Sequence, residues 1–329
     1  MIEINELNKI WMELRHESKL IRSLIVRNTG IPGLAIAFDP ISNSNKIHIR
    51  VEEAWSDGMF PNWSGLDFST EYFDVAGTSL PHIILQLVED DFEEIFSFFC
   101  RDLIENIEHS IGDERDGKIQ ETVNSWNQFF LSSREKLLSR EMQQGLFAEL
   151  DFLIILLNSA KMTKINAVNS WKGGERAYHD FQFENRVVEV KSTSSKEPKK
   201  VRISNEKQLN DSGLDLMSLL ATDLTTVDGG KELGDLFNEI CDLLSGEDIT
   251  RDKFIIQLIK YGLSPDEFHK YKTGYNVLQR QFFTVGDDFP RIISCPDGIG
   301  DLKYSITVNS CLGFETSQKN ALEGYVDGQ

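Results

Sequence analysis

The chain has 329 residues, which is enough for two or three domains, and its hydrophobic content of 40% with 21 Phe is typical of a folded protein with a substantial core. Its formal net charge of -19, from 53 acidic and 34 basic residues, argues against a protein that coats nucleic acid non-specifically. Residues 160–210 differ from the rest, with 11 Lys and Arg against 6 Asp and Glu. A ligand that carries phosphate would be attracted to this segment.

The cysteines and the apolar runs indicate a cytoplasmic protein. The four cysteines are scattered without a C-x-x-C pair, which favours free thiols in a reducing compartment over a zinc site. The N-terminus lacks the basic and apolar regions of a signal peptide. The longest apolar run, residues 152–157, is far too short to cross a bilayer, so we expect no membrane association.

Residues 1–132 are expected to form a mixed α/β domain. An amphipathic apolar stripe predicts a helix over residues 7–25, and acidic helices are expected near the end of the region. No residues here have ligand or nucleophile spacing, so a partner-binding or regulatory role is favoured. The other expected elements are strands at 34–38, 46–52, 65–75 and 83–88 and helices at 90–107 and 119–130.

Residues 133–227 are expected to form the central domain. A helix over 135–158 is almost wholly apolar after Gly145, and a strand or loop follows at 165–168. After a turn at 171–174 come a β-hairpin and a short helix that Ser204 or Asn205 could cap. A strand at 214–227 completes the order helix, strand, strand, strand, helix, strand.

Residues 228–329 are expected to form a C-terminal α+β domain that begins after the turn signal Asp228-Gly229-Gly230. Its helices are expected at 233–244 and 251–261, with a further helix start at residue 264. Its strands are expected at 277–285, 291–294 and 302–309.

The predicted hairpin, residues 179–193, gathers charged side chains on one surface. With a two-residue loop at Asn185-Arg186, the register that buries Phe181 and Phe183 opposite valines places Asp180 opposite Lys191. Glu189 shares that face, because cross-strand and diagonal neighbours lie on the same side. Two carboxylates beside an amine form a set suited to binding a divalent metal and activating water.

Glu149 interrupts an apolar stripe of the preceding helix, with Leu146 three residues before it and Phe152 three residues after it. A carboxylate there is unfavourable unless it meets a partner or a metal. Asp151 lies in a similar setting and is a rival candidate.

These residues resemble the D…E-x-K signature of the PD-(D/E)XK nuclease-like superfamily, with Asp180 followed by Glu189-Val190-Lys191. Glu149 matches an acidic residue that many members carry on the preceding helix, and Gln208 matches a polar position on the following helix. His179 stands where the motif has proline. The wider pattern also resembles an uncharacterised bacterial branch encoded beside restriction-modification and anti-phage genes.

The resemblance implies a restriction-endonuclease-like αβββαβ core with a mixed central sheet, and metal-dependent hydrolysis of DNA. Asp180, Glu189 and the Val190 carbonyl would hold Mg²⁺ or Mn²⁺, and Glu149 would hold a second ion or a ligating water. Lys191 would orient the attacking water and offset developing charge. The residues expected to contact DNA phosphates are Gln208, Lys172, Lys196, Lys199 and Lys200.

Several alternatives remain open on the sequence. Glu189 and Lys191 could be a solvated strand face, Glu149 could pair with a lysine, and the Lys196–Lys200 cluster could be a solvated loop. The chain could also be a catalytically inactive nuclease-fold subunit for assembly or DNA binding. The expected partners are DNA and other proteins of a defence or restriction-modification operon, and cutting of both strands would predict a homodimer or a two-site arrangement.

Overall fold

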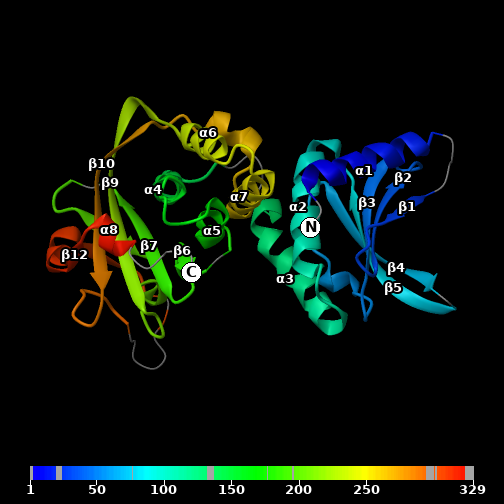
Figure 1. Cartoon of the computed structure of the whole chain (residues 1–329), viewed down its shortest axis with the longest axis horizontal. Coiled ribbons are helices and arrows are strands. Elements are labelled where there is room, and N and C mark those ends of the chain that lie inside the picture. The colour runs from blue at the N-terminus through cyan, green and yellow to red at the C-terminus, as the bar shows by residue number, and fades with distance from the viewer. Residues whose placement is uncertain are drawn as a thin grey trace. The chain divides into compact units, whose positions relative to one another are not determined.

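The structure is a computed structural model that describes residues 3–19, 24–75, 77–131, 137–175, 177–194, 196–293, 300 and 302–322 (Figure 1). The chain divides into two compact units, Met1–Ser133 and Arg134–Gln329. Among the described residues, no helix is both long and apolar enough to cross a membrane.

The first unit is an antiparallel five-stranded sheet with helices on one face. The strand order is β1-β2-β3-β5-β4, and the helices bury an aromatic core that includes Trp126, Phe99 and Trp63. The strands are β1 (Ile25–Asn28), β2 (Leu34–Asp39), β3 (Ser44–Arg50), β4 (Leu66–Val75) and β5 (Thr78–Leu87). The helices are α1 (Ile4–Glu17), α2 (Glu93–Ile107) and α3 (Gly112–Leu131), with 3₁₀ turns at Asp57–Met59 and Asp90–Phe92.

The expected helix over residues 7–25 is wrong in its second half. Helix α1 ends at Glu17, and Ile25 already belongs to strand β1, which pairs with β2. Residues 20–23 of that prediction lie outside the described residues. Ile25 continued the helical spacing by coincidence, because its backbone pairs with Phe38 in the sheet.

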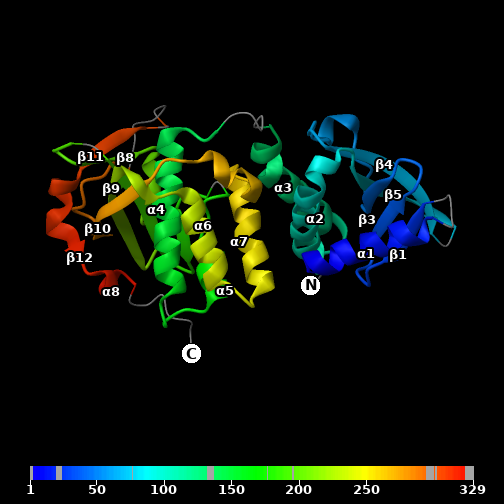
Figure 2. The ribbon, with the colours of Figure 1, turned by 90° about the horizontal axis from the view of Figure 1, so that it is seen from above.

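The second unit is built on a mixed five-stranded sheet in the order β12-β10-β9-β7-β6. Strands β7 and β9 are parallel, and the other neighbours are antiparallel. Helices α4, α5, α6 and α7 lie on one side of this sheet in both views (Figures 1 and 2). The other face packs on a core that contains Val187, Leu219 and Phe283 together with residues of the small sheet β8-β11.

The strands of this unit are β6 (Phe181–Phe183), β7 (Arg186–Thr193), β8 (Lys200–Ile203), β9 (Leu216–Lys231), β10 (Tyr275–Val285), β11 (Tyr304–Thr307) and β12 (Glu315–Thr316). The helices are α4 (Arg140–Leu157), α5 (Lys164–Ser170), α6 (Leu233–Leu243), α7 (Asp248–Tyr261) and α8 (Gln318–Ala321). The 3₁₀ turns are η3 (Glu206–Leu209), η4 (Pro265–Lys270) and η5 (Val308–Phe314).

The mixed α/β character of the fold is confirmed, but the expected strand or loop at residues 165–168 is wrong. These residues lie in helix α5, because the side chain of Thr163 caps the helix by accepting from the N–H of Asn166. The chain touches the sheet only afterwards, where Trp171 makes an isolated bridge to Phe181. Strand β8 leaves the main sheet and pairs with β11.

Strand β10 continues the same sheet as β9. The pairing runs from Tyr275 opposite Thr226 to Val285 opposite Met217. The expected domain limit between residues 227 and 228 falls inside β9, and the two glycines after it do not end the strand. A Cβ on Gly230 would stand 2.8 Å from the nitrogen of Tyr275, so the glycine permits a close approach of two backbones. The expected strand at 291–294 has no regular structure at 291–293, and residue 294 lies outside the described residues.

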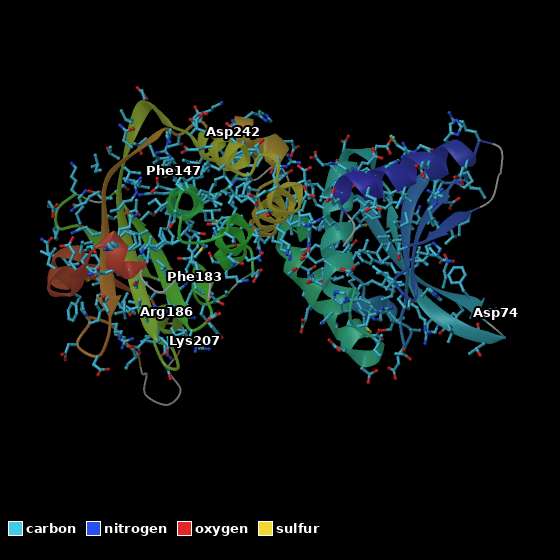
Figure 3. All side chains as sticks on the ribbon, in the orientation of Figure 1. Asp74, Phe147, Phe183, Arg186, Lys207 and Asp242 are labelled. Atoms are coloured by element: carbon cyan, nitrogen blue, oxygen red, sulfur yellow. The ribbon has the colours of Figure 1, made fainter. Side chains whose placement is uncertain are left out.

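The hairpin that carries the candidate residues is present with a different turn. Phe183 pairs with Arg186 and Phe181 pairs with Val188, so the loop is Glu184-Asn185 rather than Asn185-Arg186. Phe183 and Arg186, which flank this loop, are labelled in Figure 3. Glu184 adopts φ 49°, as this tight turn requires. The register differs by two residues, an even number, and every side chain therefore keeps the face that the alternation predicted.

Candidate active site

Asp180 ends the loop before β6 and is tied to β7 by its side chain. The N–H of Val190 donates to Oδ2 of Asp180 at 2.8 Å. The carbonyl of Asp180 accepts from the N–H of Lys172 at 2.7 Å. These bonds hold Asp180 against β7 at Val190, the residue that follows Glu189.

Glu189 is the most deeply buried carboxylate of the group, with 0% of its surface exposed. Its Oε1 is in a short ion pair with the ammonium group of Lys191, and among the described residues its Oε2 has no hydrogen-bond partner. Burial and the neighbouring charge of Asp180 raise the pKa of Glu189 to about 8, although Lys191 acts in the opposite direction. The pKa of Lys191 is raised by the surrounding carboxylates, chiefly Glu189, against the effect of its own burial.

Glu149 projects from α4 and is also buried. Its Oε2 accepts a hydrogen bond from the indole N–H of Trp171 at 2.8 Å. Burial first, and then the charge of Asp180, raise the pKa of Glu149 well above its ordinary value. The partner of this carboxyl is thus the indole of Trp171, not the lysine that the simplest alternative supposed.

The charges of Glu149, Asp180 and Glu189 affect the pKa values of the two glutamates, but the three carboxyls do not form a metal-binding cluster among the described residues. Phe181, on the same face as Val188, packs its ring 4.8 Å from that of Phe152 on α4, so the side chain of Glu189 leaves β7 on the face away from α4. Among the described residues, no group of three or more His, Cys, Asp and Glu side chains is arranged to hold a metal. The ligand roles expected for Glu149, Asp180, Glu189 and Val190 therefore stay predictions.

Asp151, the rival acid on α4, has a structural partner. Both of its oxygens accept from the guanidinium of Arg280, at 2.6 and 2.7 Å. This bidentate pair fastens α4 to β10 and leaves Asp151 no part in the site.

Two neighbours of the site are residues that sequence reasoning did not single out as functional. His179 is half-buried, its Nε2 meets no hydrogen-bond partner in the part of the chain that the structure describes, and burial lowers its pKa. Tyr261, the last residue of α7, has its pKa raised by burial and by the charges of Glu149 and Asp180. No local signal marks Tyr261, because it reaches the acids only through the packing of α7.

Of Gln208 and the expected DNA-contacting lysines, three have partners within the protein. Gln208 is on the 3₁₀ turn η3, where its Oε1 accepts from the N–H of Ser204 at 2.9 Å. Lys172 is paired with Glu175 at 3.1 Å, and Lys199 with Asp223 at 2.9 Å. The side chains of Lys196 and Lys200 are exposed. Contacts of these five residues with DNA stay predictions.

The mixed sheet and the acid-rich β6–β7 hairpin are consistent with a PD-(D/E)XK-like fold. The chain belongs to the DUF4420 family, described as "Putative PD-(D/E)XK family member", whose match covers residues 7–309. No curated protein and no solved structure matches the chain significantly.

Proposed function

We propose that the chain is a metal-dependent DNA endonuclease that hydrolyses phosphodiester bonds in restriction or phage defence. One observation carries the proposal: the half-buried carboxyl of Asp180 lies close to the fully buried carboxyl of Glu189, which is paired with Lys191, and Oε2 of Glu189 has no hydrogen-bond partner among the described residues. Clustered carboxylates in a dry site are unfavourable without a compensating cation. The family supports the same chemistry.

The donor set fits Mg²⁺ or Mn²⁺. Both ions prefer oxygen ligands, and Mg²⁺ is commonly held by one or two carboxylates together with waters and substrate phosphate oxygens. Asp180 and Glu189 would supply the carboxylates, and the Val190 carbonyl a further oxygen. Because waters and phosphate oxygens complete the ligand set, one or two carboxylates are enough to hold such an ion. A group of three or more acidic, His or Cys side chains, which the described residues lack, is therefore not needed.

The bound ion would polarise the scissile phosphate and lower the pKa of a water. Lys191, already held beside Glu189, would orient that water and offset the negative charge that develops on the phosphate. Glu149 comes from α4, on the other face of the sheet from the Glu189 side chain, so it would hold a second ion or a ligating water rather than the ion bound by Glu189. The phosphates on either side of the scissile bond would meet Gln208, Lys172, Lys196, Lys199 and Lys200.

A second candidate is a nuclease-fold subunit without catalysis that serves assembly or DNA binding. It is favoured by the internal pairing of the site, since Lys191 is bonded to Glu189 and Glu149 is bonded to Trp171. Under either candidate, the partners would be DNA and other proteins of a defence operon, and a homodimer would allow both strands to be cut.

The test is a nicking assay on supercoiled plasmid with Mg²⁺ or Mn²⁺. Asp180→Ala and Lys191→Ala are compared with Lys231→Ala, a matched control whose lysine forms an exposed ion pair with Glu239 at 2.8 Å. We expect metal-dependent nicking by the wild type and by the control, and none by the other two variants. The assay is repeated with the products of neighbouring genes.

Nicking that persists in Asp180→Ala and Lys191→Ala would reject this site as the catalytic centre. Metal-independent DNA binding without nicking, alone or with the partner proteins, would establish the second candidate in place of the first.

A further inference from the structure

Glu149 is held by a side chain that the nuclease motif does not contain. The indole N–H of Trp171 donates to its Oε2 at 2.8 Å, and Trp171 has 0% of its surface exposed. The indole N–H has no other hydrogen-bonding mode, since it is a donor only. A buried hydrogen bond of this kind fixes both the position and the rotation of the carboxyl group.

The indole is itself fixed on two sides. Its backbone forms the bridge to Phe181 at the start of β6, which ties it to the hairpin that carries Asp180. Its ring packs against α7, with ring centroids 5.9 Å from Phe254 and 6.5 Å from Tyr261. The donor therefore cannot turn away from Glu149 without disturbing both the sheet edge and α7.

Gly173 leaves the space that this contact needs. A Cβ at this position would stand 2.7 Å from Oε2 of Glu149 and 2.7 Å from Nε1 of Trp171, closer than real Cβ contacts allow. Because its φ is not in the left-handed region, the requirement for glycine is one of space. A side chain there would separate the indole from the carboxyl.

We propose that Trp171 is a positioning residue, which holds the Glu149 carboxyl in the orientation that the catalytic site requires and does so through its indole N–H. The inference rests on the proposed nuclease function and adds to it the residue that orients Glu149, the acid on α4. It also predicts that Trp171 acts only through Glu149 and has no contact with DNA or metal.

The first test detects the hydrogen bond between Trp171 and Glu149 directly and does not depend on nuclease activity. In ¹H–¹⁵N spectra of the full chain, Glu149→Leu should move the indole resonance of Trp171, assigned with Trp171→Phe. The indole of Trp126, which donates to Asp102 at 2.7 Å in the first unit, is the internal reference and should not move. An unchanged Trp171 resonance would overturn the inference whether or not the protein cuts DNA.

The second test separates positioning from stability. Trp171→Phe keeps an aromatic ring against α7 and removes the donor, and Trp126→Phe removes an equally buried indole donor far along the chain. We expect the nicking rate of Trp171→Phe to fall about ten- to a hundredfold, as when an outer partner of a ligand is removed. Trp126→Phe should nick like the wild type at a temperature where both variants are folded by circular dichroism.

A double-mutant cycle shows whether Trp171 acts through Glu149. In a Glu149→Ala background, Trp171→Phe should cause no further loss, because the group that it positions is gone. Equal losses in both backgrounds would overturn the inference. If the wild type nicks nothing under any condition, the proposed function fails, and the indole spectra together with Mn²⁺ titration calorimetry of Trp171→Phe and Trp126→Phe decide the positioning.

Gly173→Ala gives an independent perturbation of the same contact. It should reproduce the loss of Trp171→Phe, whereas Gly286→Ala, whose added Cβ would meet nothing within 4 Å, should not. Wild-type nicking by Gly173→Ala with an unmoved Trp171 indole resonance would show that the contact tolerates the added methyl group and would contradict the spatial argument.

Discussion

The N–H of Val190 donates to Oδ2 of Asp180 at 2.8 Å, so the Asp180 carboxylate joins β6 to β7 in addition to any role with a metal. The two roles are separable because asparagine keeps an acceptor oxygen at this position and loses the charge. A comparison of two substitutions can therefore assign structure and chemistry to different atoms of one side chain.

Asp180→Asn should remain close to the wild type in stability, whereas Asp180→Ala should lose about 1–3 kcal/mol, because the Val190 N–H is left without its acceptor. Both substitutions remove the repulsion between Asp180 and Glu189, so their difference isolates the hydrogen bond. Both should abolish nicking. Urea unfolding and the plasmid assay measure the two effects, and an active Asp180→Asn would show that the charge at this position is dispensable.

The faces of the hairpin could be predicted from the sequence, but its turn could not. Alternation fixes which residues share a side, and it survives a register difference of two residues. The choice between Asn185-Arg186 and Glu184-Asn185 depends on whether Glu184 adopts positive φ, which its residue type does not favour. The face that carries Asp180, Glu189 and Lys191 was for this reason the more secure part of the prediction.

The distinction between Glu149 and Asp151 required the fold. Both acids interrupt the apolar run of α4, but Asp151 meets Arg280, which lies 129 residues further along the chain, and Glu149 meets Trp171. No local pattern contains such long-range partners. The glycines after Asp228 were similarly ambiguous, because a turn and a close approach of two strands both require glycine.

The stability of the protein should fall as the pH rises from about 5 to about 8. The pKa of Glu189 is about 8 in the folded protein against 4.5 for the ordinary side chain, so in this window the folded state holds a proton that the unfolded state has released. Stability then decreases by at most about 1.4 kcal/mol per pH unit for this group and levels off above pH 8. The raised pKa of Glu149 acts in the same direction.

The measurement is urea unfolding at a series of pH values without divalent metal. Glu189→Gln should have a shallower slope between pH 5 and 8 than the wild type, and Glu149→Gln/Glu189→Gln a shallower slope still. A slope in the wild type that is flat, or that rises with pH, would show that Lys191 keeps Glu189 ionised throughout this range.

Asp223 should weaken the binding of DNA by holding Lys199. The ammonium of Lys199 lies 2.9 Å from Oδ1 of Asp223, so its charge is largely compensated before a phosphate approaches. Asp223→Asn should strengthen binding and steepen its salt dependence by about one phosphate contact, and Lys199→Ala should have little effect. Lys196→Ala, which removes an exposed charge, should weaken binding.

Fluorescence anisotropy of a labelled duplex at several salt concentrations tests this order, with inactive Lys191→Ala as the parent so that no DNA is cut. If Asp223→Asn leaves the salt slope unchanged, Lys199 does not face the phosphates. The lysine cluster would then be a solvated loop.

A chain that ends at residue 231 should not fold its second unit, although it retains the whole nuclease motif. Without β10, strand β9 would lose its antiparallel neighbour from Met217 to Thr226. It would also remove Phe283, Val285 and Phe289 from the core, where each is at most 4% exposed. Burial of one such side chain contributes about 1.5–3 kcal/mol, and a domain is typically stable by only about 5–15 kcal/mol. Residues 134–329 alone, by contrast, should unfold in one cooperative transition by circular dichroism. Cooperative unfolding of residues 134–231 would show that the motif-bearing strands form a core without β10.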